Sequence, residues 1–216
     1  MNHNVVQNLN LIINEVELKS KNVKIIAVSK TFPTEIIYPL IDFGHLHFGE
    51  NKVQEAISKW PDIKDKYKNI KLHLIGKLQT NKVKYVLPLF DYIHSLDNLK
   101  LADKINSEQE KKKFKPKIFI QVNIGNEIQK SGVKEEDLGL FIKDCRNKFK
   151  LDIIGLMCIP PNDNNEEFYF KKMCELCKKF KLNELSMGMS NDYKLAIENG
   201  ATFIRVGSKI FGERTK

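Results

Sequence analysis

The sequence predicts an α/β fold, a single-domain (β/α)8 barrel of the TIM type with one extra helix at its N-terminus. About eight short apolar runs alternate with amphipathic stretches along the 216 residues, which is typical of parallel strands covered by helices on both faces. Eight such units favour a closed barrel. The alternative, an open doubly wound sheet, usually carries Gly-x-Gly-x-x-Gly after its first strand, and the sequence has no such motif there.

The expected elements follow in order along the chain. The extra helix covers residues 5–18, where apolar residues recur at helical spacing before the first strand. Strands are expected where short apolar runs occur, at residues 25–28, 46–48, 72–75, 92–94, 118–122, 151–157, 184–186 and 203–206. Helices are expected in the amphipathic stretches 34–43, 52–60, 80–87, 98–113, 135–149, 165–180 and 193–199, with a short helical segment at 209–211. No linker-like break interrupts the series, so residues 1–216 are expected to form one domain.

Composition limits the possible functions. The formal net charge is +9, but the lysines are spread along the chain and form no basic stripe interleaved with aromatics, which argues against nucleic-acid binding. No apolar run is long enough to span a membrane, and the N-terminus has no basic segment before an apolar one. We therefore expect a cytoplasmic protein without a membrane partner.

The cysteines do not form a metal site by their spacing. Cys174 and Cys177 are separated by two residues, but no second pair or nearby histidine completes a ligand set. All four cysteines are expected to be reduced thiols, and no metal is expected.

Active sites of barrels form at the carboxyl ends of the strands, and Lys30 follows the first strand there. Lys30 alternates with Ile26 and Val28, so the three side chains point the same way. If that direction is inward, burial lowers the pKa of a lysine and makes its amine nucleophilic, the usual route to Schiff-base lysines. The alternative is a lysine that reaches solvent at the strand end.

Arg205 stands inside an otherwise apolar strand and is one of only three arginines. A guanidinium within a barrel strand is costly unless something pairs with it. The partner could be a ligand, or a carboxylate on another strand in a purely structural ion pair. Glycines and serines occur near the ends of the last two strands, at Gly188 and Ser190 and at Gly207 and Ser208. Loops in these positions form the recurrent phosphate site of barrels. Strands 7, 8 and 1 are neighbours in a closed barrel, so one ligand could touch these groups together. A phosphate, a ring and an aldehyde meeting a lysine describe pyridoxal 5′-phosphate (PLP).

At these residues the sequence resembles the pyridoxal phosphate homeostasis proteins, whose fold matches the barrel domain of alanine racemase. The matching segments, in the family's order, are residues 27–31 (AVSKT), 48–51 (FGEN), 73–76 (HLIG), 78–82 (LQTNK), 130–132 (KSG), 155–157 (GLM), 185–190 (LSMGMS), 205–207 (RVG) and 210–212 (IFG).

The resemblance implies a role for each candidate site residue. Lys30 would carry PLP, and Arg205 would face the pyridine nitrogen. Ser190, Gly207 and Ser208 would hold the phosphate, and Asn51 and Met189 would be pocket residues. His73 lies in a family motif, and its two interpretations, a functional residue and a satisfied core histidine, both stay open. Family members usually have threonine at position 208, and proline or histidine where this chain has Lys77.

The resemblance implies a protein that carries or buffers PLP as a lysine Schiff base and supports PLP homeostasis, without catalytic turnover. The chain ends at Lys216, just past the barrel, so we expect no racemase-type β-domain and a monomer. PLP-dependent apoenzymes are expected as possible recipients of the cofactor. The alternative is a single-domain PLP-dependent amino-acid racemase. A third class, a nucleic-acid or protein adaptor, is suggested only by the net charge.

Overall fold

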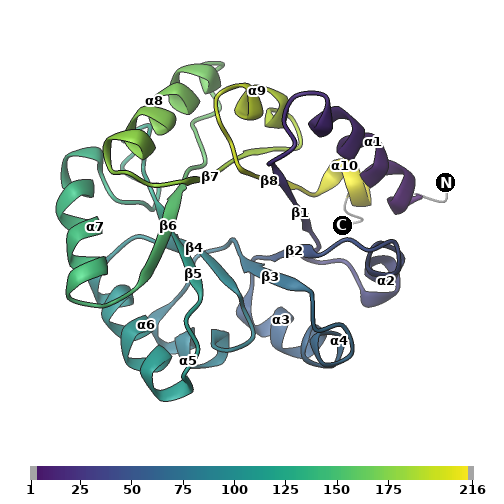
Figure 1. The fold of residues 1–216 in the computed structure, drawn as a ribbon, viewed down its shortest axis with the longest axis horizontal. Coiled ribbons are helices and arrows are strands. Elements are labelled where there is room, and N and C mark those ends of the chain that lie inside the picture. Colours follow the sequence, from purple (N-terminus) through teal and green to yellow (C-terminus); the bar gives the residue numbers. More distant parts are fainter. Residues whose placement is uncertain (1–3, 214–216) are drawn as a thin grey trace.

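The computed structural model describes residues 4–213, in which eight parallel strands close into one barrel in sequence order (Figure 1). The strands are β1 (Lys24–Val28), β2 (His47–Glu50), β3 (Lys71–Leu74), β4 (Tyr92–Leu96), β5 (Lys117–Gln121), β6 (Asp152–Met157), β7 (Glu184–Met189) and β8 (Phe203–Val206). β8 returns to pair with β1, where Ile26 lies opposite Arg205. The predicted (β/α)8 barrel is therefore confirmed. The expected domain bounds 1–216 include residues 1–3 and 214–216, which lie outside the described residues.

Helices surround the barrel and cover the outer face of the strands (Figure 1). They are α2 (Thr34–Asp42), α3 (Val53–Lys59), α4 (Pro61–Lys66), α5 (Val83–Val86), α6 (Leu99–Lys112), α7 (Leu138–Asn147), α8 (Glu166–Lys179) and α9 (Tyr193–Glu198). Asn98 caps α6 by accepting a hydrogen bond from the Leu101 N–H at 2.9 Å, which fixes where this helix begins.

The extra helix α1 (Val5–Glu17) packs against the short last helix α10 (Ser208–Phe211), as Figure 1 shows. The Asn8 amide donates to the Ile210 carbonyl at 2.9 Å, and Tyr193 on α9 donates to Glu15 on α1. Because α10 has only four residues, α1 covers the wall of the barrel that a full eighth helix would cover. This contact fixes the segment after β8, which borders the candidate site.

Two apolar clusters stabilise the fold. The larger one lies between the strands and the surrounding helices. The smaller one fills the barrel interior with Ile26, Tyr92, Phe119, Met157 and Phe203, one residue from each of five strands. A barrel filled with large side chains is a packed core and not a pore, so the space for a ligand is left above this layer, at the carboxyl ends of the strands.

The structure differs from the sequence prediction in a few elements. Strand β7 continues to Met189, so Gly188 and Met189 lie in the strand and not in the following loop. The region expected as a helix at 80–87 is a 3-10 turn, η1 (Thr80–Lys82), followed by the single turn of α5. Helix α4 was not predicted, since it buries only Ile63 and shows no apolar periodicity. Within residues 4–213, no helix is long and apolar enough to cross a membrane.

Candidate functional site

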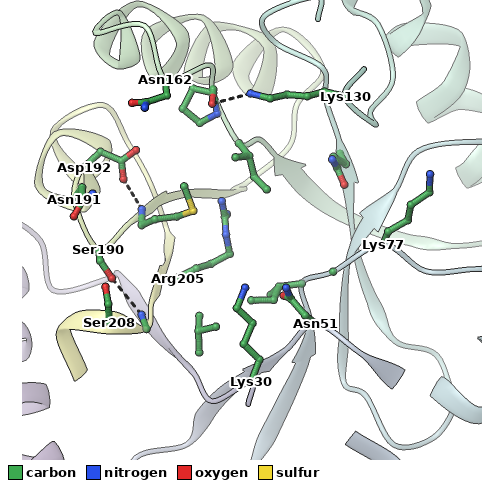
Figure 2. A pocket seen from close by; sticks show the side chains of 18 of the residues that line it. Lys30, Asn51, Lys77, Lys130, Asn162, Ser190, Asn191, Asp192, Arg205 and Ser208 are labelled. Atoms are coloured by element: carbon green, nitrogen blue, oxygen red, sulfur yellow. Dashed lines mark hydrogen bonds between the residues drawn. The ribbon is translucent and has the colours of Figure 1, made fainter. Parts of the chain in front are cut away.

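A cavity of about 1040 Å³ opens at the carboxyl ends of the strands. All seven site residues proposed from the sequence line this cavity, and Figure 2 labels Lys30, Asn51, Ser190, Arg205 and Ser208 among them. They are Lys30, Asn51, Met189, Ser190, Arg205, Gly207 and Ser208. They come from the ends of β1, β2, β7 and β8 and from the start of α10. The closed order of the strands brings β7, β8 and β1 side by side, so residues 175 positions apart in the sequence share one wall.

Lys30 points into the cavity toward Arg205 (Figure 2). Ile26 lies in the barrel interior and Val28 lines the cavity, so the alternation along β1 directs all three side chains inward. Lys30 is half-buried at the cavity wall, which favours a role in the cavity over a lysine that only extends to bulk solvent.

The backbone that carries Lys30 is held by Lys59 on α3. The Lys59 ammonium donates to the carbonyls of Ser29 and Phe32, at 3.0 and 3.2 Å. Between them, Thr31 adopts φ +70°, a conformation that β-branched residues rarely take and that costs about 1–3 kcal/mol. The Thr31 N–H donates to the Glu55 carboxylate at 2.5 Å, and that carboxylate also accepts from Lys59 at 3.1 Å. Together these contacts hold the turn in one conformation. They therefore fix the position of the backbone from which the Lys30 side chain extends.

Lys59 also neutralises the fully buried carboxylate of Glu50. The Lys59 Nζ and Glu50 Oε1 atoms are 2.7 Å apart, and Ser29 and Trp60 donate to the same oxygen at 2.7 and 3.0 Å. Glu50 Oε2 is buried and accepts no hydrogen bond within residues 4–213. Burial raises the pKa of Glu50 and outweighs the opposing effects of Lys59, Trp60 and Ser29. The folded protein therefore depends on the Lys59 ammonium to stabilise the buried Glu50 carboxylate.

Arg205 is 5% exposed, and its guanidinium is held by neutral groups. Nη1 donates to Ser186 Oγ and Nη2 donates to the Cys158 carbonyl, both at 2.8 Å. No carboxylate oxygen of residues 4–213 forms an ion pair with it, so the expected alternative of a structural ion pair is not found. Burial lowers the pKa of the guanidinium, but the ordinary value is so high that the group stays charged. A buried cation at a cavity wall without an anionic partner in the described chain is suited to a ligand acceptor.

The wall formed by β7 and β8 presents backbone N–H groups and hydroxyls. The Gly207 N–H donates to Ser190 Oγ at 3.4 Å, and Ser208 is the first residue of α10 (Figure 2). Gly188 has φ +88°, and a Cβ there would lie 2.6 Å from the Cβ of Ala196, so only glycine fits this bend of the strand. The bend directs residues 189 and 190 over the cavity.

The cavity has further residues at its opposite wall, of which the sequence prediction missed Lys130. Lys130 lines the cavity and pairs with Glu127 at 2.5 Å. Lys77, noted from the sequence as a departure from the family, lies at the wall formed by the end of β3 (Figure 2). His73 does not line the cavity: it is fully buried in the barrel interior, between His47 and His94. The only signal in the sequence for a contact among these histidines is that each of them lies within an expected strand.

Comparison with known proteins agrees with this geometry. The family model described as alanine racemase, N-terminal domain, matches residues 3–215. The pyridoxal phosphate homeostasis protein of Haemophilus influenzae is 38% identical, over 98% of this chain and 96% of its own length. That of Aquifex aeolicus is 40% identical, over 88% of this chain and 87% of its own length. The structure of PipY from Synechococcus elongatus PCC7942 with PLP bound is 34% identical, with a TM-score of 0.86, over 96% of this chain and 100% of that chain.

A closed barrel with an amine and a guanidinium at its mouth, matched along nearly its whole length by that family model, defines an alanine-racemase-type barrel. Within that class, the chain belongs to the pyridoxal phosphate homeostasis protein family.

Proposed function

We propose that this protein binds PLP in the cavity at the barrel mouth and carries or buffers it in the cell. The observation that carries the proposal is the shared cavity of the Lys30 amine and the buried Arg205 guanidinium, next to the serines and glycines of β7 and β8. PLP has an aldehyde, a pyridine nitrogen and a phosphate, and this wall offers a complementary group for each. PipY, a relative of the chain, is described with PLP bound.

Each group has a separate task in this proposal. The Lys30 amine would form the covalent link to the aldehyde. Arg205 would donate an N–H to the ring nitrogen. Ser190 and Ser208 would donate to the phosphate, and Gly207, whose N–H donates to Ser190 Oγ, would help to hold it. Asn51 and Met189 would be pocket residues beside the ring. The turn at Thr31 and the Gly188 bend hold these donors in place before the ligand arrives, which reduces the ordering cost of binding.

The same geometry supports binding without turnover. PLP enzymes that stabilise a carbanion use the ring as an electron sink, and a protonated ring nitrogen strengthens that sink. Arg205 stays protonated and can only donate, so it favours an unprotonated nitrogen. The relatives are named as homeostasis proteins, which supports the same proposal. The alternative, a single-domain amino-acid racemase, would exchange the α-proton of an amino acid, and an arginine at the ring nitrogen makes the ring a weaker electron sink for that step.

Further proposals concern the setting of the protein. We propose that residues 1–216 act as one PLP-binding domain, as a monomer in the cytoplasm, which delivers PLP to apoenzymes. The four cysteines are unpaired, as expected in a reducing compartment.

Titration of the purified protein with PLP, followed by α-proton exchange, tests the proposed function. We expect saturable binding of about one PLP per chain, seen as a change in PLP absorption. The loaded protein should exchange no α-proton of alanine in heavy water above the rate of free PLP. Absence of saturable binding would contradict the carrier function, and fast exchange would instead support the racemase alternative.

Ser190→Ala and Ser208→Ala should each weaken PLP binding more than they weaken folding. A lost hydrogen bond to a charged phosphate costs about 1.5–3 kcal/mol, or roughly tenfold or more in Kd. Both hydroxyls would contact one phosphate, so their effects need not add. Ser131→Ala, a serine at the opposite cavity wall, is the matched control and should leave Kd unchanged. An unchanged Kd in the double variant would remove both serines from the phosphate site.

A further inference from the structure

A line of hydrogen bonds crosses the barrel interior from Arg205 to the opposite end of the barrel. Arg205 Nη1 donates to Ser186 Oγ at 2.8 Å, and that oxygen lies 2.9 Å from His94 Nδ1. His94 Nε2 lies 2.9 Å from His73 Nδ1, and His73 Nε2 lies 2.9 Å from His47 Nδ1. The five side chains come from β8, β7, β4, β3 and β2. His47 is the first residue of β2, so the line ends at the amino-terminal rim.

The donor at one end fixes the direction of the whole line. A guanidinium can only donate, so Ser186 Oγ accepts from Arg205. Within residues 4–213, the only other hydrogen-bond partner of the Ser186 hydroxyl is His94 Nδ1. If Nδ1 carried a proton, the buried Ser186 hydroxyl proton would have no acceptor, which is costly, so we expect Nδ1 to accept it. A neutral His94 with a bare Nδ1 carries its proton on Nε2 and donates to His73. The same reasoning places the His73 proton on Nε2, from which it is donated to His47.

The surroundings keep these imidazoles neutral and immobile. Burial lowers the pKa of His73 and His94 well below the ordinary range, and it lowers the pKa of His47 to about 4. The Tyr92 ring stacks on His73 at a centroid distance of 4.2 Å, and the Phe119 ring stacks on His94 at 4.3 Å. The three rings are therefore neutral near neutral pH, and stacking restricts the rotation of His73 and His94.

We propose that Ser186, His94, His73 and His47 are positioning residues for Arg205, which act through a one-directional hydrogen-bond line that begins at its guanidinium. The line keeps the Ser186 lone pair directed at Nη1, while the Cys158 carbonyl holds Nη2. Of the five guanidinium N–H groups, these two bonds use two within residues 4–213, so three remain for a ligand in the cavity. The proposal rests on the proposed function in one respect only, namely that the ligand of Arg205 is PLP.

Behind Arg205, the line contains no group that would act as an acid toward the cavity. Its imidazoles are neutral and the Ser186 hydroxyl donates away from Arg205, so no member would transfer a proton to the ring nitrogen of a bound PLP. The line would hold the guanidinium donor still and leave the ligand nitrogen unprotonated, which deepens the proposed non-catalytic role.

Nitrogen-15 NMR of the full chain without PLP tests the direction of the line. Two-bond couplings distinguish protonated from unprotonated ring nitrogens, and histidine-to-glutamine variants assign the signals. We expect His94, His73 and His47 all to carry the proton on Nε2 near neutral pH. A proton on Nδ1 of His94 would overturn the proposal, because Ser186 could not then donate to it. This readout needs no cofactor, so it remains valid if the protein binds no PLP.

Ser186→Ala tests the positioning of Arg205. We expect both neutral tautomers of His94 to be populated in this variant, and the Arg205 N–H signals to average because the side chain rotates faster. The Kd for PLP should rise about tenfold, which is the effect of one lost hydrogen bond. Ser186→Thr keeps the hydroxyl and should restore the wild-type pattern. Ser95→Ala is the matched control, because Ser95 on β4 is also buried but its hydroxyl has no hydrogen-bond partner in the described chain.

Two results would overturn the positioning role. One is an Arg205 signal and a PLP Kd that are unchanged in Ser186→Ala, and the other is an equal change in Ser95→Ala, which would indicate general loosening of the core. If Ser186→Ala does not fold, His94→Phe gives the same test, since a phenyl ring can keep the stacking on Phe119 but accepts no proton from Ser186.

Discussion

Replacement of Lys59 by methionine is expected to destabilise the protein by about 3–5 kcal/mol, the usual effect of removing one partner of a buried ion pair. Lys59 and Glu50 are 7% and 0% exposed, and Lys59 also donates to two carbonyls of the turn that carries Lys30. The variant leaves the Glu50 carboxylate buried without its cation. Chemical denaturation near neutral pH measures the change in the free energy of unfolding.

The destabilisation of Lys59→Met should depend on pH in a defined direction. Burial already raises the pKa of Glu50, and loss of Lys59 raises it further. The folded variant then binds a proton more tightly than the unfolded chain, so its stability falls as pH rises through that raised pKa. The decrease in the free energy of unfolding caused by Lys59→Met should be smaller near pH 5 than near pH 8. The exposed pair of Lys68 and Asp65 is the control, and Lys68→Met should cost no more than about 1 kcal/mol. A similarly small loss in Lys59→Met would show that the buried pair does not hold the turn.

Lys30→Ala is expected to abolish covalent retention of PLP, from about one PLP per chain to none after gel filtration, because no other amine would form the link to the aldehyde. The phosphate groups and Arg205 would still bind PLP weakly and reversibly. The change should leave the free energy of unfolding within about 1 kcal/mol, since Lys30 is only half-buried. Lys77→Ala is the matched control from the same cavity, and it should retain PLP fully. Full retention by Lys30→Ala would move the covalent site elsewhere.

Features with a local cause in the sequence could be predicted. The eight strands are short apolar runs because each buries both faces, and the helices between them show an apolar face. The alternation of Lys30 with Ile26 and Val28 predicted that the three side chains point the same way, because strand periodicity fixes relative side-chain direction. That this direction is inward came from the structure. All seven proposed site residues line one cavity, while their contacts with PLP stay predictions.

Features made by distant residues could not be predicted. The hydrogen-bond line joins histidines 21 to 26 positions apart and a serine 92 positions further on, with no local pattern to indicate that they meet. The role of Lys59 depends on where α3 places its ammonium relative to the Ser29 carbonyl. Helix α4 has a polar sequence and follows from Pro61 at its first turn rather than from periodicity.

Borohydride reduction of the PLP-loaded wild-type protein, followed by peptide mapping, tests the central claim most directly. Reduction makes the link between an amine and the PLP aldehyde permanent, so the modified lysine can be located by mass. We predict a phosphopyridoxyl group on the peptide that contains Lys30, and none in Lys30→Ala treated in the same way. An adduct found only on Lys77 or Lys82 would contradict the account, because the cofactor would then be held away from Arg205 and the phosphate-binding serines.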